Sequence, residues 1–414
     1  MNNNLKNKPI AIVLGGTFPH ITLINNLQQR GYYTILVDYN KYPPAKDAAD
    51  EHIQESTLDK EKVLEIARER GVKLVISACI DQANVTACYV AEKLGLPLPY
   101  SYETAINVTN KVLMKRRMID YGIPTSKYYH LKDLKDYNQL ELQFPVVVKP
   151  TDSNSSKGVR KASNGEEMNK FLQYAFMISR SNEAIVEEFK EGREIGADCY
   201  VQNKDTTILM TRERRKIAMN EDPIQQIQGS IWPADISKKI LNDLKKIANK
   251  IAYAFNLDNT PLMIQAIVNN DEINIIEFAP RIGGGENYKI IQLHTDFDII
   301  DAAIDSFLGL QVNLNYKLPV LYYADIYIYT RPGLFGNIAN YEELIKNKVV
   351  EYLNTYKTKG VEIGSDISSN NRVGAFTVKS DKISELFEKI NTSLENIEVY
   401  DTYGEPIMRK DIYY

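Results

Sequence analysis

Cysteine and histidine are scarce in this sequence of 414 residues, which contains three cysteines and four histidines. They are scattered along the chain and match no metal-binding spacing, which argues against a zinc or histidine-based metal site. No apolar run approaches membrane-spanning length, and the first residues lack the apolar core of a secretory signal. We therefore expect a cytoplasmic protein with reduced thiols and no membrane partner. A net charge of -4 and a pI near 5.8 do not provide the basic field that nucleic-acid binding through bulk charge requires.

The composition is that of an ordinary globular chain, with 44% hydrophobic and 25% charged residues. Between residues 8 and 100, apolar strands alternate with amphipathic helices, with strands at 9–14, 34–37 and 74–77 and helices at 60–70 and 82–94. This alternation predicts an open parallel α/β sheet. Gly15 and Gly16 follow the first strand and Asp38 ends the second, as in dinucleotide sites. The glycines do not fit G-x-G-x-x-G, however, and a tight turn is their alternative role.

A lysine in an apolar strand is a candidate for anion binding. Residues 144–150 read FPVVVKP, and Lys149 is costly to bury unless an anion meets it. The next residues, 151–159, are small and rich in hydroxyls, which suits a loop whose amides surround phosphate oxygens. Upstream, 101–121 is a helical segment that carries Lys111 and several further cations, whose alternative role is a solvated face.

Acidic residues follow in two more strands. Glu187 and Glu188 occupy the strand 184–189, where alternation places them on opposite faces, so that one can point into a cleft. Such a carboxylate can accept an adenine amino group, and a second one can accept ribose hydroxyls, with generic ion pairs as the alternative. The strand 206–216 ends in a cationic cluster, and 220–232 is expected to be a polar loop over the site.

The stretch from Leu262 to Glu286 predicts a hairpin, with strands at 262–268 and 273–278 and a polar turn between them. Counting by twos places Ile273, Ile275 and Glu277 on one face of the second strand. An acid in an apolar strand needs a cation or a hydrogen-bond donor, and Gln265 can supply a second oxygen ligand for magnesium. Arg281 and three glycines follow, which suits phosphate handling. The alternative is a hairpin stabilised by a Glu277–Arg281 pair.

The last hundred residues predict a small α+β unit. Helices are expected at 288–294 and 299–308, and a strand at 320–329 opens the unit. Short strands near 336–338, 349–355 and 372–378 and helices at 341–346 and 383–394 complete it. No internal repeat or low-complexity segment is present.

In this order the motifs resemble the ATP-grasp superfamily, most closely its carboxylate-amine ligases of the L-amino-acid ligase group. They are also similar to the grasp domains of carbamoyl-phosphate synthase and biotin carboxylase. The resemblance rests on Lys111, VVVKP, SNSSKGV, EEFKEGRE, and Gln265 with Glu277 ahead of PRIGGG. It implies an α/β and α+β protein with an N-terminal open parallel pre-ATP-grasp domain at 1–105, a two-part ATP-grasp domain at 106–312 and a small C-terminal α+β domain at 313–414.

The resemblance also assigns roles to residues of this sequence. It implies ATP contacts at Lys111, Lys149, Ser153, Ser155, Ser156, Gly158, Glu187, Phe189, Lys190 and Glu194. It implies Gln265 and Glu277 as ligands of Mg²⁺ or Mn²⁺, Lys149, Glu277 and Arg281 as catalytic residues, and Gly283, Gly284 and Glu286 as substrate contacts. Two positions depart from the family pattern: Ala279 replaces an asparagine that usually follows the metal glutamate, and the phosphate loop has only Gly158.

The activity implied is the ATP-dependent joining of a small-molecule carboxylate to an amine through an acyl phosphate, with release of ADP and phosphate. Carboxylation with bicarbonate, as in purine-pathway grasp enzymes, is an alternative. ATP binding without turnover, in a regulatory protein, is an alternative of another class, and a dinucleotide oxidoreductase leaves Lys149, Glu277 and Arg281 without roles. The identities of the carboxylate and the amine stay open, and a homodimer is the family expectation.

Overall fold

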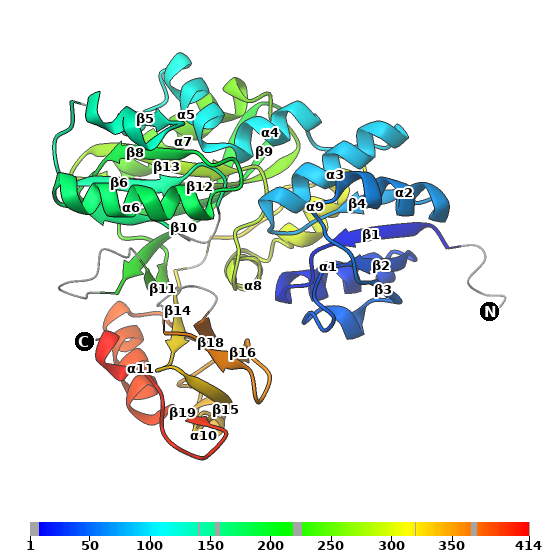
Figure 1. Cartoon of the computed structure of the whole chain (residues 1–414). Coiled ribbons are helices and arrows are strands. Elements are labelled where there is room, and N and C mark those ends of the chain that lie inside the picture. The colour runs from blue at the N-terminus through cyan, green and yellow to red at the C-terminus, as the bar shows by residue number, and fades with distance from the viewer. Residues whose placement is uncertain are drawn as a thin grey trace.

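The computed structural model describes residues 8–139, 141–153, 158–217, 226–318, 320–365 and 371–413, with the backbone alone at 137–139. Ser155 and Ser156 therefore lie outside the described residues. The chain forms an N-terminal layered unit, a central unit built on two sheets, and a C-terminal unit beside the central one (Figure 1). The predicted combination of an N-terminal parallel sheet with mixed and antiparallel α/β structure is confirmed.

The N-terminal unit is a four-stranded parallel sheet in the order β3-β2-β1-β4. Its strands are β1 (Ile10–Leu14), β2 (Tyr33–Val37), β3 (Glu51–Ile53) and β4 (Leu74–Ile76), and its helices are α1 (Phe18–Gln29), α2 (Lys60–Arg70) and α3 (Asp81–Leu94). The central strand β1 reads IAIVL and is buried from its second residue onward, as expected for a parallel sheet covered on both faces. The later helix α9 (Ile299–Phe307) packs on α1 and joins the same core.

A small antiparallel sheet in the order β5-β8-β6-β7 begins the central unit. Its strands are β5 (Tyr128–Leu131), β6 (Val146–Pro150), β7 (Arg160–Ala162) and β8 (Ala184–Glu188). Helix α6 (Gly165–Ile178) covers one face with Met168, Leu172 and Ala175, whose spacing gives one apolar stripe. The other face is left for the polar side chains described below.

An eight-stranded sheet in the order β13-β12-β9-β10-β11-β14-β18-β16 forms the rest of the central unit and continues into the C-terminal unit. The central strands are β9 (Arg193–Gln202), β10 (Asp205–Lys216), β11 (Ile227–Trp232), β12 (Thr260–Asn269) and β13 (Glu272–Ala279). Helix α7 (Lys238–Ala254) covers this part of the sheet with Ile240, Leu244 and Ile251. Ser237 caps the helix by accepting a hydrogen bond from the backbone NH of Ile240.

The C-terminal unit shares strands with this sheet, because β14 (Tyr322–Tyr329) pairs with β11 on one side and with β18 (Arg372–Ser380) on the other. Strand β16 (Tyr352–Thr355) ends the sheet, and α10 (Glu342–Lys346) and α11 (Ile383–Asn396) are its helices. A three-stranded sheet of β17 (Glu362–Ile363), β15 (Gly333–Ala339) and β19 (Glu398–Asp401) completes the unit. Elsewhere along the chain, short 3₁₀ turns lie at Lys46–Ala48, Leu134–Gln139 and Lys410–Ile412.

Two local expectations differ from the structure. The helical segment 101–121 is two helices, α4 (Tyr102–Thr109) and α5 (Lys111–Asp120), because Asn110 is extended and its side chain accepts hydrogen bonds from the first turn of α5. The expected loop 220–232 is in its second half the buried strand β11, which pairs with β10 and β14, while 218–225 lie outside the described residues. Because the pairing partners of β11 come from other parts of the chain, the polar composition of this segment incorrectly predicted a loop.

Candidate functional site

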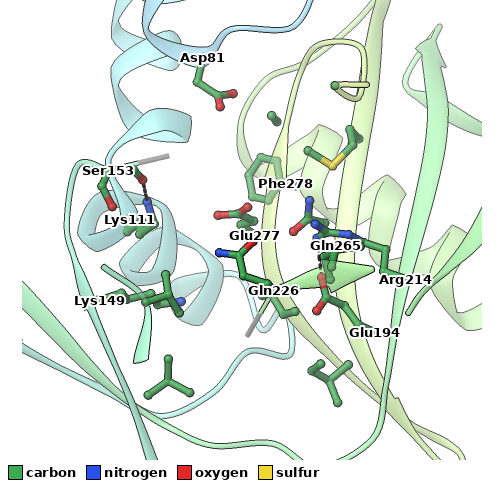
Figure 2. A pocket seen from close by; sticks show the side chains of 18 of the residues that line it. Asp81, Lys111, Lys149, Ser153, Glu194, Arg214, Gln226, Gln265, Glu277 and Phe278 are labelled. Carbon is green, nitrogen blue, oxygen red and sulfur yellow. Dashed lines mark hydrogen bonds and ion pairs between the residues drawn. The ribbon is translucent and has the colours of Figure 1, made fainter. Parts of the chain in front are cut away.

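One pocket of about 480 Å³ lies between the small sheet, the eight-stranded sheet and the start of α3. Most of the predicted site residues line it, namely Lys111, Lys149, Ser153, Glu187, Phe189, Lys190, Glu194, Gln265, Glu277, Arg281 and Gly284. Lys111 and Lys149 lie on one side and Glu194 on the other, with Glu277 and Gln265 between them (Figure 2). Elements that are far apart in the sequence, from Lys111 to Gly284, thus meet in a single cavity of a size suited to a small-molecule ligand.

Glu277 faces this pocket because of a bulge in the hairpin. In the β12–β13 pair, Gln265 lies directly opposite Glu277, but the register shifts at the next position, where Ala266 lies opposite Ile275. Ile276 is the extra residue, and a bulge of this kind reverses the alternation beyond it. Ile273 and Ile275 belong to a buried cluster and do not line the pocket, whereas Ile276 and Glu277 line the pocket and lie outside that cluster. The predicted grouping of Glu277 with Ile273 and Ile275 on one face is therefore wrong.

The alternative Glu277–Arg281 pair does not form. Arg281 binds Asp81 at the start of α3 through two contacts, from Nε to Oδ1 at 2.6 Å and from Nη2 to Oδ2 at 2.7 Å. Burial opposes the charge of Arg281, but the carboxylate of Asp81 raises its pKa above the ordinary value. Within the described residues Glu277 forms no ion pair, so this half-buried carboxylate is available to a cation from outside the chain.

A buried triad holds Glu187 on β8. Its carboxylate lies 2.7 Å from Nζ of Lys149 and 3.3 Å from Nζ of Lys115 on α5, and the Lys115 and Glu187 side chains are 2% and 5% exposed. Although burial opposes its charge, the two lysines lower the pKa of Glu187. Burial lowers the pKa of Lys115 to about 8. Glu188, by contrast, is exposed, as the alternation predicted, although it also lines the pocket.

Lys115 was not among the predicted site residues. The signal for it was present, because Met114 and Met118 flank it at helical spacing and all three are buried on one face of α5. Its Nζ also donates to Oγ1 of Thr125 at 2.8 Å, which holds the ammonium group in place.

Lys111 begins α5, directly after the cap residue Asn110. Its Nζ donates to the backbone carbonyl of Ser153 at 2.6 Å, and burial lowers its pKa. Of the phosphate-loop residues predicted with it, Ser153 lines the pocket, and Gly158 (φ +79) does not, although its neighbour Val159 does. Lys111 and the described start of the loop therefore meet at the pocket wall.

Strands β9 and β10 contribute charged side chains of both signs to the pocket. Arg212, Arg214 and Lys216 are spaced by two on β10 and all line the pocket. Arg212 forms a buried ion pair with Asp198, and Glu194 lies within ion-pair distance of Arg214 and, at 3.5 Å, of Lys216. Eight of the described lining side chains are cationic and five are carboxylates, so the cavity favours an anionic ligand.

Two of the predicted substrate residues do not line the pocket. Gly283 lies against polar side chains instead, since a Cβ added to it would be 2.3 Å from Nδ2 of Asn287 and 2.9 Å from Oδ1 of Asp198. Glu286 precedes α8 (Asn287–Thr295) without a side-chain capping bond, is 2% exposed and accepts from Oη of Tyr356 at 3.4 Å. Burial raises the pKa of Glu286.

The glycine turn of the N-terminal sheet has a structural explanation. The carboxylate of Asp38 accepts hydrogen bonds from the backbone NH groups of Gly16 and Asn40, both at 2.8 Å. Gly15 has φ +95, a conformation that favours glycine. The acid that a dinucleotide site would use is therefore engaged within the turn.

The donors that a metal could use are few. Over the described residues, no group of three His, Cys, Asp or Glu side chains could hold a metal ion by itself. Gln265 and Glu277 lie opposite each other across the hairpin and both line the pocket, and Mg²⁺ is commonly held by one or two oxygen ligands together with substrate phosphates. The residues present thus fit Mg²⁺ when a phosphate ligand accompanies it.

None of the helices in the described residues has the length and the apolar composition that spanning a membrane requires.

The fold and the pocket define a class of protein. The N-terminal parallel sheet is followed by a small and a large antiparallel sheet, and a cationic pocket lies between these two. Residues 142–288 match the family model of the ATP-grasp domain. The match covers the strands that carry Lys149, Glu187, Glu194, Gln265 and Glu277, so this part of the chain is similar to ATP-grasp domains.

Two relatives in sequence match about three fifths of the chain. The C-terminal section of the carbamoyl phosphate synthase large chain from Aquifex aeolicus is 24% identical over 264 residues, which cover 62% of this chain and 48% of that protein. Formate-dependent phosphoribosylglycinamide formyltransferase from Wolinella succinogenes is 24% identical over 273 residues, which cover 63% of this chain and 66% of that protein. This chain thus spans about half of the first relative and just under two thirds of the second.

Two crystal structures share the fold over almost the whole chain. The L-amino acid ligase from Bacillus licheniformis has a TM-score of 0.79 at 17% identity, with 96% of this chain and 99% of that chain covered. Phosphoribosylglycinamide synthetase from Anaerococcus prevotii has a TM-score of 0.75 at 21% identity, with 95% and 100% covered.

Proposed function

We propose that this protein is an ATP-dependent carboxylate-amine ligase that activates a small-molecule carboxylate as an acyl phosphate and joins it to an amine. The observation that carries the proposal is that Lys111, Lys149, Glu187, Gln265 and Glu277 line one cationic pocket, although they come from five different elements. Phosphoryl transfer depends mainly on positioning and electrostatic stabilisation, which a cavity of this composition provides without a histidine base.

ATP lies in the half of the pocket nearest the small sheet. Lys111 and Lys149 bind its phosphates, Glu187 accepts from the adenine amino group beside the backbone of Phe189 and Lys190, and Glu194 accepts from the ribose. Lys149 reaches the phosphates by giving up part of its contact with Glu187, which Lys115 continues to neutralise. Glu187 and Glu188 both line the pocket, but Glu188 is exposed and pairs with Lys190, so we assign the adenine contact to Glu187.

Gln265 and Glu277 hold a divalent cation, Mg²⁺ or Mn²⁺, together with the ATP phosphates. When bound, the cation offsets the charge that the phosphoryl oxygens carry during transfer. Ala279 supplies no further oxygen ligand from its side chain, so Gln265 and Glu277, which face each other across the hairpin, are the metal ligands that we assign to the protein.

The reaction has two steps. An oxygen of the carboxylate substrate attacks the γ-phosphorus, the bond to the β,γ-bridging oxygen breaks, and an acyl phosphate and ADP result. The amine then attacks the acyl carbon and expels phosphate, so that an amide forms. Arg281, which Asp81 holds at the pocket wall, stabilises the charge of the phosphoryl group during both steps.

The proposal is tested by ADP release with a panel of carboxylate and amine pairs, in the presence of Mg²⁺ and after its removal by a chelator. Glu277→Gln should reduce turnover by about 100-fold or more, the size of effect seen when one stabilising group at a transition state is removed. Glu272→Gln is the control, since Glu272 lies on the same strand and is exposed. Undiminished turnover by Glu277→Gln would contradict the metal assignment, and ADP release that depends on bicarbonate rather than on a second carboxylate would favour carboxylation.

A further inference from the structure

A second, much smaller cavity lies between α3, α4 and the residues that follow β13. Its volume is about 10 Å³, and its wall includes Asp81, Asn84, Tyr100 and Arg281. Asp81 and Arg281 also line the large pocket. The ion pair that these two residues form is therefore part of the wall between the two cavities.

Asn84 brings a polar side chain to the small cavity without a partner from the chain. It lies on α3 three residues after Asp81, so the two side chains lie on the same face of the helix. Asn84 is 3% exposed, and neither its Nδ2 nor its Oδ1 has a hydrogen-bond partner among the described residues. Buried polar groups are almost always bonded to protein or to ordered water, because an unpaired buried amide is costly. The amide of Asn84 therefore requires a partner from outside the chain.

The small cavity has the size and the polar lining that a single water needs. A water requires roughly 10 to 15 Å³ of room and about two to four polar partners. The volume of about 10 Å³ meets the first condition. Asn84 offers both donors and an acceptor, and Asp81, Tyr100 and Arg281 bring further polar side chains to the same space. A larger ligand does not fit, so one water is the partner that this cavity can provide.

Arg281 has donors left for such a water. A guanidinium carries five N–H groups. Nε and Nη2 of Arg281 donate to Asp81, and Nη1 donates to the backbone carbonyl of Ile282 at 2.7 Å. These three bonds leave two N–H groups. Because Arg281 lines both cavities, one of them can serve the phosphoryl group in the large pocket and the other the water behind it.

We infer that Asn84 is a positioning residue, which holds a buried water against the Asp81–Arg281 pair and thereby fixes the guanidinium in the large pocket. This inference rests on the proposed function, in which Arg281 stabilises the phosphoryl group. Asn84 does not line the large pocket, so it acts on the reaction through the arginine. A bridging water is nearly as good as a direct hydrogen bond, and a displacement of about 1 Å in a reacting geometry can reduce a rate by about 100-fold.

Asn84→Leu separates this role from a role in folding. Leucine is similar in shape to asparagine but replaces the amide by an apolar group, which offers the water no partner. Leucine also favours helices more than asparagine does, so the variant should unfold thermally at the same temperature as the wild type or above it. Its kcat for ADP release, measured with the most active pair of the carboxylate and amine panel, should nonetheless fall roughly 10- to 100-fold. The dissociation constant of a non-hydrolysable ATP analogue should be unchanged, because the contact matters in the transition state.

Three further variants locate the effect. Thr86→Val is the matched control, since Thr86 is also 3% exposed on α3 but lines neither cavity, and its kcat should be unchanged. Asn84→Ser should restore part of the lost rate, because a hydroxyl can still bond to the water. In Asp81→Asn, where Arg281 is already held less firmly, Asn84→Leu should have a smaller effect than in the wild type. A folded Asn84→Leu enzyme with the kcat of the wild type would overturn the inference, as would an equal loss in Thr86→Val.

Crystal structures keep this inference separate from the proposed function. The wild type and Asn84→Leu are crystallised with Mg²⁺ and the ATP analogue, at a resolution that shows ordered waters. We expect a water within hydrogen-bond distance of the Asn84 amide and of Asp81 or Arg281 in the wild type, and no water at this place in the variant. That result would support the water site even if no pair of substrates releases ADP, an outcome that would count against the ligase proposal only. A wild-type structure without this water would overturn the inference, whether or not the variant folds.

Discussion

Replacing Lys115 by methionine separates the role of this buried lysine in nucleotide binding from any role in folding. The pKa of Lys115 is lowered from 10.5 to about 8, so its charge is disfavoured in the folded protein by roughly 3 kcal/mol at about 1.4 kcal/mol per pKa unit. The side chain is 2% exposed, so solvent screening does not reduce this figure appreciably. Met114 and Met118 already pack on the same helical face. Lys115→Met should therefore fold at least as stably as the wild type.

Nucleotide binding, in contrast to stability, should be weaker in Lys115→Met than in the wild type. Without Lys115, Glu187 has Lys149 as its remaining cation, and Lys149 cannot move to the ATP phosphates without leaving a buried carboxylate uncompensated. The phosphates then lose one charge-assisted contact of about 1.5 to 3 kcal/mol. This corresponds to a dissociation constant for ATP that is roughly 10- to 150-fold higher.

The assay pairs urea unfolding without nucleotide with calorimetric titration of a non-hydrolysable ATP analogue. Arg116→Met is the control, because Arg116 is the next residue of α5 and is exposed. A loss of stability of about 3 to 5 kcal/mol would show that the lysine serves the fold, since that is the cost of breaking a needed buried pair. Unchanged nucleotide affinity in Lys115→Met would refute the role assigned to the triad.

Two further predictions concern pH and the glycine run. Because Lys115 is charged below about pH 8 and neutral above it, the affinity of the wild type for the ATP analogue should fall as pH rises from 7 to 9, and calorimetry should show a smaller fall in Lys115→Met; equal pH dependence in both proteins would contradict the assignment. Gly283→Ala should destabilise the protein by about 1 to 3 kcal/mol in urea unfolding, since its Cβ meets Asn287 and Asp198, whereas Gly284→Ala, with no atom within 4 Å of its Cβ, should have little effect. Equal stability of the two variants would argue against that crowding.

Much of the fold is local and could be read from the sequence. The apolar runs that became β1, β6 and β12 are long enough to identify without a partner, and the apolar stripe of α7 with its cap residue Ser237 identifies a helix. The order of lysine strand, acidic strand and acid-bearing hairpin was also visible, because each is a short motif of fixed spacing. These features depend on neighbours within a few residues, which is why pattern alone was sufficient.

The orientation and partners of the site residues were decided by tertiary structure. The bulge at Ile276 turns Glu277 toward the pocket, and one inserted residue cannot be detected by counting along a strand. Arg281 meets Asp81 across 200 positions of sequence, and Arg372 reaches the pocket only because β18 joins the eight-stranded sheet. Sequence alone determined which residue types could bind a charged nucleotide. Only the packing of distant strands decided which of those charges neutralise one another and which remain open to a ligand, because Coulomb interactions depend on distance in space.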